Sequence, residues 1–464
     1  MVKPSARDYD RTTTVKLVGG LSVLGATLLA GAAFITPREA RAIPSFTEQT
    51  GQPCTSCHVG GFGPELTPFG REFKIGGYTL RTHSAIPIGA GTIASWTRTR
   101  KDQSAPPEHF NRNDNFALDD FSLFVGGGVG SHFGGFSEVS YNGIARTTAL
   151  EMMDLRAVTP AKIFGADSTL GLSVNNAPMV QDPWNTSPPW SFPYIESGVA
   201  PEPETAPLIN MLMGNVIGVT GYAWIGGKAY VEAGGYASPS RGTLRFIGAE
   251  DMPGSIRGVA PYGRIAWQTD LAGGTFQVGA NAFKAALFPM RDRSSGFSDR
   301  YTDLGIDSSW QKTLGKADTL SLNFRYEHEK GNLRASCALG LLGDPSGSDG
   351  PGCANYHLNT VRGTVGYNWR SRIGAGLSAF SIAGSRNFNL YPETGKPDSN
   401  GLTAQLDYTF WGRDKSPLGP RFNARVGVQY TVYGKFGGRR RNFDLEGRNA
   451  ADNNTFKLFT WIAF

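Results

Sequence analysis

The chain has 464 residues, of which 18% are charged and 11% aromatic, and it contains 61 glycines and 4 cysteines. Its formal net charge of +6 is modest and spread along the sequence, which excludes the concentrated basic surface of a nucleic-acid-binding protein. Low charge, many aromatics and no apolar run of spanning length after the N-terminus are typical of a membrane β-barrel. A soluble β-sandwich would share part of this composition.

The first 42 residues have the features of an export signal. Four basic residues precede an apolar stretch from Leu17 to Ile35, and Ala40-Arg41-Ala42 then provides a small-x-small cleavage site. We interpret residues 1–42 as a signal peptide, with the mature chain starting near Ile43. The apolar stretch is also long enough to remain as an uncleaved anchor helix, so that alternative stays open.

Cys54-Thr55-Ser56-Cys57-His58 is the attachment motif of c-type haem. The two thiols form covalent bonds to the porphyrin vinyl groups, and the histidine that follows binds the iron. A zinc site is the alternative, but it needs four ligands, and no second pair of cysteines or histidines lies nearby. We therefore expect one covalently bound haem c, held by Cys54, Cys57 and His58.

The motif does not fix the distal ligand of the iron. His83 is the only conventional candidate in the N-terminal segment outside the motif, and we take it as the candidate metal ligand. His83 can equally be a polar linker residue, with the ligand supplied by the rest of the chain or missing. Candidates elsewhere are His109, His132, His328, His357 and methionines such as Met152.

A short helix is predicted after the haem motif, with Thr67 as its N-cap and Pro68 at its first position. Arg71 and Lys74 on this helix either pair with the haem propionates or form an ordinary solvated face. The residues expected to form an apolar shell around the haem are Phe46, Phe62, Leu66, Phe69, Phe73 and Tyr78.

From about residue 91 to Phe464, apolar and polar residues alternate in segments of roughly ten residues. In one of them Leu402 and Leu406 alternate with Thr403 and Gln405, and this period of two places one set in lipid and the other in a polar lumen. About sixteen antiparallel strands are predicted. They begin near residues 91, 114, 133, 149, 168, 215, 228, 258, 273, 299, 318, 355, 372, 401, 420 and 454.

The predicted connections alternate between short and long, which is the signature of an outer-membrane barrel with both termini in the periplasm. The terminal Phe464 on an alternating last strand fits the same class. Tight periplasmic turns are expected at 226–227, 314–318 and 369–372, and external loops at 178–214, 239–257, 333–354, 388–400 and 434–453.

Cys337 and Cys353 bracket a Gly/Ser/Pro-rich stretch inside one predicted external loop. We expect a disulfide bond between them that closes this loop, as is common in exported proteins. Two free thiols are the alternative.

Two runs that flank the haem motif, PSFTEQTG at residues 44–51 and PELTPFGREFK at 64–74, resemble the fused cytochrome–porins of the outer membrane. That family includes the iron oxidases of iron-oxidising bacteria. The resemblance implies a very short monohaem cytochrome joined to a barrel of about sixteen strands. Thr47 and Glu48 replace the Ala-Arg usual at these positions. The sequence therefore leaves open whether this chain is an iron oxidase or an electron-transfer protein with another donor.

These observations divide the chain into a signal peptide, a cytochrome segment at 43–80, a linker at 81–90 and a transmembrane barrel at 91–464. The apolar belt of such a barrel is about 25 Å tall, so a haem wholly in the periplasm would lie too far from an external donor. We therefore expect the cytochrome segment to be a plug in the lumen.

The expected function is an outer-membrane electron conduit, embedded in outer-membrane lipid. Electrons would pass from an extracellular donor, ferrous iron by the resemblance, to a periplasmic carrier such as a soluble cytochrome. The alternatives are a diffusion porin with an independent tethered cytochrome, and a haem that binds a small ligand at a vacant distal position.

Overall fold

The computed structural model describes residues 44–61, 63–82, 88–203, 205–249, 253–315, 317–342, 355–414, 416–418 and 422–464, all within one compact unit. The expected signal peptide, His83 and Cys353 lie outside these residues. No helix within the described part of the chain is long and apolar enough to cross a membrane.

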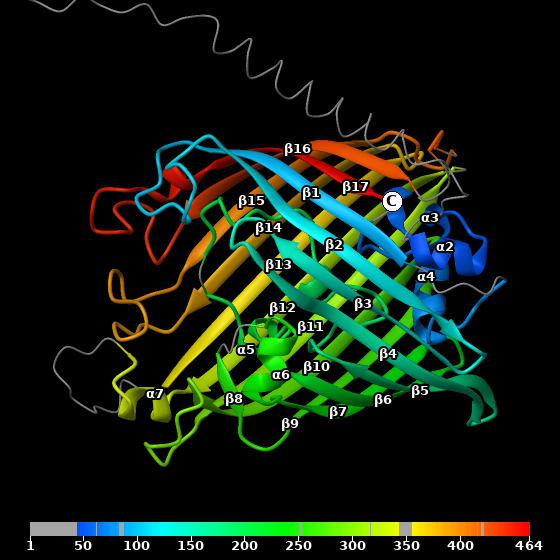
Figure 1. Cartoon of the computed structure of the whole chain (residues 1–464), viewed down its shortest axis with the longest axis horizontal. Coiled ribbons are helices and arrows are strands. Elements are labelled where there is room, and N and C mark those ends of the chain that lie inside the picture. The colour runs from blue at the N-terminus through cyan, green and yellow to red at the C-terminus, as the bar shows by residue number, and fades with distance from the viewer. Residues whose placement is uncertain are drawn as a thin grey trace, which may run out of the picture. The chain divides into compact units, whose positions relative to one another are not determined.

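Antiparallel strands form one closed barrel (Figure 1). The first strand, β1 (Ile88–Thr99), pairs with β2 (Asn115–Val129) on one side and with the last, β17 (Thr455–Ala463), on the other, which closes the sheet. The described residues contain seventeen strand segments. Two of them, β8 (Gly254–Ile256) and β9 (Ala260–Leu271), pair with the same neighbour, so the barrel has sixteen strand positions, as predicted.

The remaining elements follow in chain order. The strands are β3 (Phe133–Asn142), β4 (Thr147–Ile163), β5 (Ala166–Asn175), β6 (Ile217–Ile225), β7 (Ala229–Ala237), β10 (Gly274–Pro289), β11 (Asp299–Leu314), β12 (Asp318–Asn332), β13 (Asn355–Trp369), β14 (Ile373–Gly384), β15 (Ser399–Thr409) and β16 (Asn423–Lys435). The helices are α2 (Pro44–Thr50), α3 (Cys54–Cys57), η1 (Val59–Gly61), α4 (Pro68–Ile75), η2 (Pro188–Trp190), α5 (Leu208–Met211), α6 (Arg241–Phe246), α7 (Arg334–Ala338) and η3 (Ala450–Asn453). Every barrel strand begins within three residues of its predicted start.

The two faces of the barrel differ as the alternation predicts. On β15, Leu402 and Leu406 are exposed on the outer face, whereas Thr403 and Gln405 are buried in the lumen. The outward residues of a membrane barrel contact lipid, which explains why large apolar side chains are exposed there. The expected all-β outer-membrane fold is therefore confirmed.

Turn lengths distinguish the two ends of the barrel. Short turns follow β2, β4, β6, β9, β11 and β13, and long connections lie mainly at the opposite end. The start of β1 and the end of β17 lie at the short-turn end, which in outer-membrane barrels faces the periplasm. Two connections depart from the expected alternation: residues 143–146 form a short turn at the long-loop end, and the connection from β15 to β16 is longer than its neighbours.

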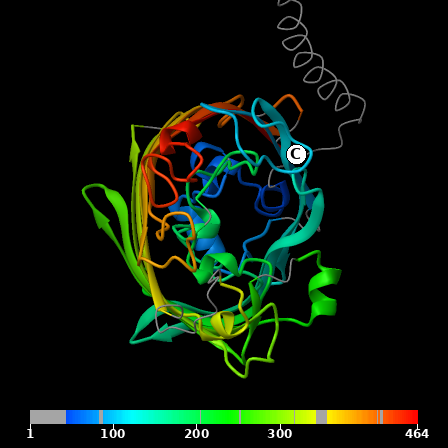
Figure 2. The same cartoon turned by 90° about the vertical axis from the view of Figure 1, so that its left-hand side faces the viewer.

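The prediction that residues 178–214 form an external loop is wrong, because the connection between β5 and β6 folds into the barrel (Figure 2). Arg362 Nη1 donates a hydrogen bond of 2.6 Å to the Phe192 carbonyl, and Lys457 Nζ donates one of 3.2 Å to the Ile195 carbonyl. Lumen-facing cations of distant strands thus satisfy the backbone of this segment. We call residues 176–216 the inward loop.

Candidate functional site

Residues 44–82, which we call the plug, lie in the lumen at the short-turn end of the barrel (Figure 1). The plug is held by hydrogen bonds to the barrel wall and to the inward loop. They join Arg425 Nη2 to the Gly60 carbonyl (2.9 Å), Asn185 Nδ2 to the Pro64 carbonyl (2.6 Å), Gln311 Nε2 to the Leu66 carbonyl (3.3 Å), the Tyr222 hydroxyl to the Ile75 carbonyl (2.5 Å), the Tyr78 hydroxyl to Asp154 Oδ2 (2.8 Å) and the Gly128 N–H to Gln49 Oε1 (2.7 Å).

The haem motif forms a single helical turn, α3, followed by an extended residue. Cys54 and Cys57 are three positions apart on this turn, so their side chains share one face, and both are free thiols. His58 leaves the helix with φ −120° and ψ 136°. Burial raises the pKa of Cys54 to about 11 and that of Cys57 to about 12, so both sulfurs are protonated at neutral pH.

The environment of His58 suits a metal ligand. Burial lowers the pKa of His58 to about 4, although a hydrogen bond to the Gly63 backbone opposes this, so the imidazole is neutral. Its buried Nδ1 atom has no hydrogen-bond partner. A ligating imidazole needs one nitrogen oriented by a hydrogen bond and the other free to bind the metal.

Helix α4 begins as predicted and packs directly on the motif. The Thr67 side chain accepts a hydrogen bond from the Gly70 N–H (3.2 Å), which confirms the predicted N-cap. The Thr67 N–H donates to the Cys57 carbonyl at 2.9 Å. Gly70 faces the same carbonyl so closely that no side chain fits there. The cysteines are therefore presented on a rigid backbone.

A cavity of about 790 Å³ adjoins the motif, a volume typical of sites that hold a ligand as large as a cofactor. Cys54, Cys57 and His58 all line it, and its opposite wall is the inner face of β1 to β4. The cavity also reaches Asn142 and Gly248 at the long-loop end of the barrel. Its position and lining fit one haem c attached to the two cysteines.

Most of the predicted apolar shell lies beside this cavity. The rings of Phe46 and Tyr78 stack with centroids 5.3 Å apart, and Phe73 packs edge-on against Phe46 at 5.0 Å. Leu66 is buried and lines the cavity too. Phe69 departs from the prediction, because it is 39% exposed and does not line the cavity. Phe62 lies outside the described residues.

The two basic residues of α4 do not face the cavity as free cations. Lys74 Nζ donates to the Val180 carbonyl (2.7 Å), the Asp182 carbonyl (2.8 Å) and Asn185 Oδ1 (2.7 Å), so all three of its protons are used. Arg71 is buried and lines a second cavity instead. The alternative of an ordinary solvated face is wrong, because both side chains are buried and the inward loop supplies the partners of Lys74; pairing with a haem propionate stays a prediction.

Five residues outside the N-terminal segment were named above as candidates for the distal ligand of the iron. Of these five, only Met152 lines the cavity next to His58. His109 lies in the loop between β1 and β2, and His132 in the turn after β2, where its Nδ1 contacts the Val158 carbonyl at 2.9 Å. His328 and His357 stack on each other along β12 and β13. His83 lies outside the described residues and stays a prediction.

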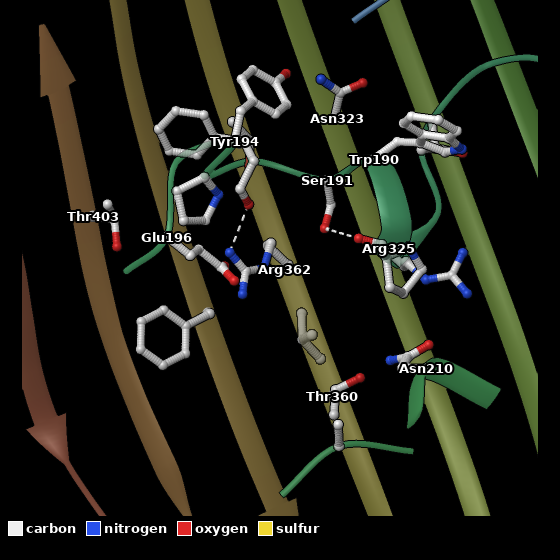
Figure 3. Close-up of a pocket in the computed structure, with 18 of the residues that line it drawn as sticks. Trp190, Ser191, Tyr194, Glu196, Asn210, Asn323, Arg325, Thr360, Arg362 and Thr403 are labelled. Carbon is white, nitrogen blue, oxygen red and sulfur yellow. Dashed lines mark hydrogen bonds between the residues drawn. The ribbon is translucent and has the colours of Figure 1, made fainter. Parts of the chain in front are cut away.

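The second cavity, of about 260 Å³, lies between the inward loop and the strands from β11 to β17 (Figure 3). Arg362, Arg325 and Glu196 line it, and the hydrogen bond from Arg362 to the Phe192 carbonyl lies at its edge. Tyr194 and Trp190 of the inward loop contribute to both cavities. The inward loop therefore divides the lumen into two compartments.

The carboxylates of the first cavity, which we call the haem-side cavity, were not among the predicted site residues. Its lining includes Asp119, Asp120, Glu138, Glu151, Glu196 and Glu202. A local signal was present, because the adjacent pair Asp119-Asp120 interrupts the alternation of β2.

Cys337 lies in α7, and the free thiols among the described residues are those of Cys54 and Cys57. Cys353 lies outside the described residues, so the disulfide bond stays a prediction.

Strand pairing, the apolar outer face and the turn lengths define an outer-membrane-type β-barrel with a plug in its lumen. No protein-family model and no curated protein matches the chain. Among solved structures, it is similar to the anion-selective porin of Comamonas acidovorans, with 11% identity, coverage of 82% of this chain and 99% of the porin, and a TM-score of 0.44. It is also similar to OprB of Pseudomonas putida (12% identity, 81% and 92% coverage, TM-score 0.45) and to OmpF of Salmonella typhi (11% identity, 81% and 97% coverage, TM-score 0.45).

Proposed function

We propose that the protein carries electrons across the outer membrane through one haem c, attached to Cys54 and Cys57 with His58 as the proximal ligand. The observation that carries this proposal is the position of the motif inside the lumen, beside a cavity of about 790 Å³. A bound haem supplies reversible one-electron chemistry. The plug and the barrel wall would keep the haem away from lipid, beside a cavity that extends from the motif towards the long-loop end.

The two ends of the barrel serve different partners. The plug lies at the short-turn end, where a soluble periplasmic carrier such as a small cytochrome accepts the electron. The cavity extends towards the long-loop end, where an extracellular donor arrives. Ferrous iron is the proposed donor on the basis of the resemblance described above, and the protein then acts as an iron oxidase. Met152 is the proposed distal ligand from the barrel wall.

Reconstitution in liposomes tests this function. Vesicles that contain the haem-loaded protein enclose oxidised soluble cytochrome c, and ferrous iron is added outside. We expect the enclosed cytochrome to be reduced, and a Cys54→Ala/Cys57→Ala control, which keeps the barrel but cannot attach haem, to leave it oxidised. If haem-loaded vesicles transfer no electrons, the conduit is refuted.

A diffusion porin with an independent cytochrome is the second candidate. The observation that favours it is the second cavity, whose lining of Arg362, Arg325 and Glu196 resembles a polar path for small solutes (Figure 3). Liposome swelling with sugars of increasing size distinguishes the two functions. Rapid permeation through the haem-loaded protein would support the porin, whereas a closed lumen would support the conduit.

A further inference from the structure

We infer that the outer face of the barrel carries a binding site for a phosphorylated lipid of the outer leaflet, formed by four basic side chains near the long-loop end. They are Arg257, Lys284, Arg300 and Lys330, and we call them the basic patch. The inference goes beyond the proposed electron transfer and does not depend on bound haem. It follows from the distribution of charge on neighbouring strands and from an apolar groove beside them.

The strand register brings three members of the basic patch together. Lys284 of β10 pairs with Thr302 of β11, and Thr302 pairs in turn with Lys330 of β12. Arg300 is two residues from Thr302 on the same strand, so it is a diagonal neighbour of both lysines, at a backbone distance of about 7–8 Å. All three side chains are exposed, because they alternate with residues that are buried in the lumen.

Arg257 extends the basic patch to the segment that follows β8. Its backbone N–H donates a hydrogen bond of 2.7 Å to the Ala286 carbonyl, and Ala286 of β10 pairs with Arg300 on its other side. The two arginines therefore flank one small residue, about 10 Å apart across two strand spacings. Arg257 is exposed as well, so the four positive charges share one face.

The acidic residues of these strands do not neutralise the basic patch. Five of them point into the lumen and are at most 1% exposed: Asp299, Asp303, Asp307, Glu327 and Glu329. Asp318 begins β12 at the short-turn end. In the loop after β10, Asp292 accepts a hydrogen bond of 2.7 Å from the Ser294 N–H, and the adjacent Arg293 balances its charge. Within the described residues, no side chain of the basic patch forms a hydrogen bond or an ion pair.

Basic residues at the same end of other strands do have acidic partners. Arg98 Nε, at the end of β1, lies 3.6 Å from Asp114 Oδ1, and Lys435 Nζ, at the end of β16, lies 3.3 Å from Asp398 Oδ2. Like charges on neighbouring strands destabilise a sheet. The basic patch is therefore stabilised by an anionic partner that comes from outside the chain.

The basic patch lies where the apolar band of the outer face ends. Towards the middle of the barrel, β11 continues with Leu304 and Ile306, each 51% exposed, and β12 with Phe324, which is 44% exposed. In outer-membrane barrels the long loops are extracellular, so the patch lies at the level of the head groups of the outer leaflet. Phosphate groups form strong charge-assisted hydrogen bonds with arginine and lysine, which makes a phosphorylated head group the matching anion.

An apolar groove beside the basic patch has room for part of an acyl chain. The groove has a volume of about 450 Å³, and its exposed apolar side chains are those of Ile217, Val219 and Val259. Val259 is two residues after Arg257, so the groove begins next to the patch. A head-group phosphate on the patch and an acyl chain in the groove belong to one lipid molecule, whereas free phosphate would leave the groove unused. The site is therefore assigned to a lipid.

Titration of the full-length protein with lipid A, a glycolipid that carries two phosphates and several acyl chains, tests the site. Native mass spectrometry from detergent counts the lipid molecules that each chain retains. We expect saturable binding that Lys284→Gln/Arg300→Gln weakens about tenfold or more, because each basic residue near an anionic lipid contributes to its binding. The matched control, Lys228→Gln/Arg370→Gln, removes one exposed lysine and one exposed arginine from short turns and leaves the affinity unchanged. Absence of saturable binding, or equal binding by both variants, would overturn the inference.

If the double variant does not fold, Lys330→Gln alone keeps the test decisive, because it changes one exposed side chain without a partner, and a loss of about fivefold is expected. A second measurement distinguishes a lipid from free phosphate. Lipid A from which both phosphates have been removed is expected to bind about tenfold more weakly or less, and inorganic phosphate at the concentration of lipid A is expected not to displace it. Unchanged binding of the dephosphorylated lipid, or displacement by inorganic phosphate, would contradict the assignment.

Discussion

Gly70 of α4 lies directly against Cys57 of the haem motif: a Cβ atom on Gly70 would come within 2.3 Å of the Cys57 carbonyl oxygen. No flexible side chain separates the two, so a substitution must displace backbone. The spacing between the haem motif and helix α4 therefore requires glycine at position 70.

Gly70→Ala is expected to lower covalent haem attachment at least twofold. The added methyl overlaps the Cys57 backbone, and forced overpacking of this kind costs about 1–3 kcal/mol. The measurement is haem absorbance per chain after denaturation, together with the intact mass. Gly242→Ala in α6 is the control, because the nearest atom to a Cβ there is the Ser240 side-chain oxygen at 3.6 Å. Full haem content in Gly70→Ala would contradict the tight packing.

Lys74→Met is expected to loosen the contact between the plug and the inward loop. The substitution leaves three acceptors on Val180, Asp182 and Asn185 without their donor, each at a cost of about 1–3 kcal/mol if it stays dry. Hydrogen exchange of residues 176–185 is expected to accelerate while strand amides stay protected. Lys228→Met, at a turn of the barrel, serves as the control. Equal exchange in both variants would show that Lys74 is dispensable.

Met152→Leu is expected to change the coordination of the haem iron if the barrel supplies the distal ligand. Loss of a thioether ligand lowers the reduction potential and leaves a vacant position that binds carbon monoxide. Ferric electron paramagnetic resonance and carbon monoxide titration measure this directly. Met213→Leu is the matched control, because Met213 lines the same cavity. Unchanged spectra in Met152→Leu would return the assignment to His83 or to an open site.

Leu406→Arg and Val129→Arg test the depth of the lipid-facing band. Leu406 is 53% exposed in the middle of β15, whereas Val129, 74% exposed, ends β2 next to a short turn. An arginine costs about 2–4 kcal/mol near the bilayer midplane and about 0–1 kcal/mol near the interface. Urea titration of the barrel in bilayers is expected to show a large loss for Leu406→Arg only. Comparable losses would mean that the short-turn end lies deeper than inferred.

The sequence located the strands well because lipid and lumen impose opposite requirements on successive residues. Gln405 and Leu406 are neighbours in the chain, yet one is buried among polar groups and the other faces outward. This alternation of polar and apolar residues involves only neighbours in the chain, so it can be recognised in the sequence of each strand. The helix start at Thr67 was equally predictable, since a cap and a following proline are adjacent residues.

The inward loop was not predictable in the same way. Its position depends on Arg362 and Lys457, which lie 170 and 262 residues from their partners Phe192 and Ile195. The polar, proline-rich sequence of this connection is the same whether the loop is external or folded into the lumen, so composition alone cannot distinguish the two. The carboxylates of the haem-side cavity are an intermediate case, because Asp119-Asp120 breaks the period of two in the sequence but Glu151 joins the others only through strand pairing.

The position of the plug also bears on the order of haem attachment and barrel closure. Gln49 bonds to Gly128 of β2 and Gly60 to Arg425 of β16, on strands that flank the seam where β1 meets β17. Closing that seam encloses Cys54 and Cys57. If Cys54 and Cys57 carry the proposed haem c, we expect the haem to be attached in the periplasm before the barrel closes, because a closed barrel leaves both thiols inside the lumen. A chain whose barrel closes first would then lack the haem.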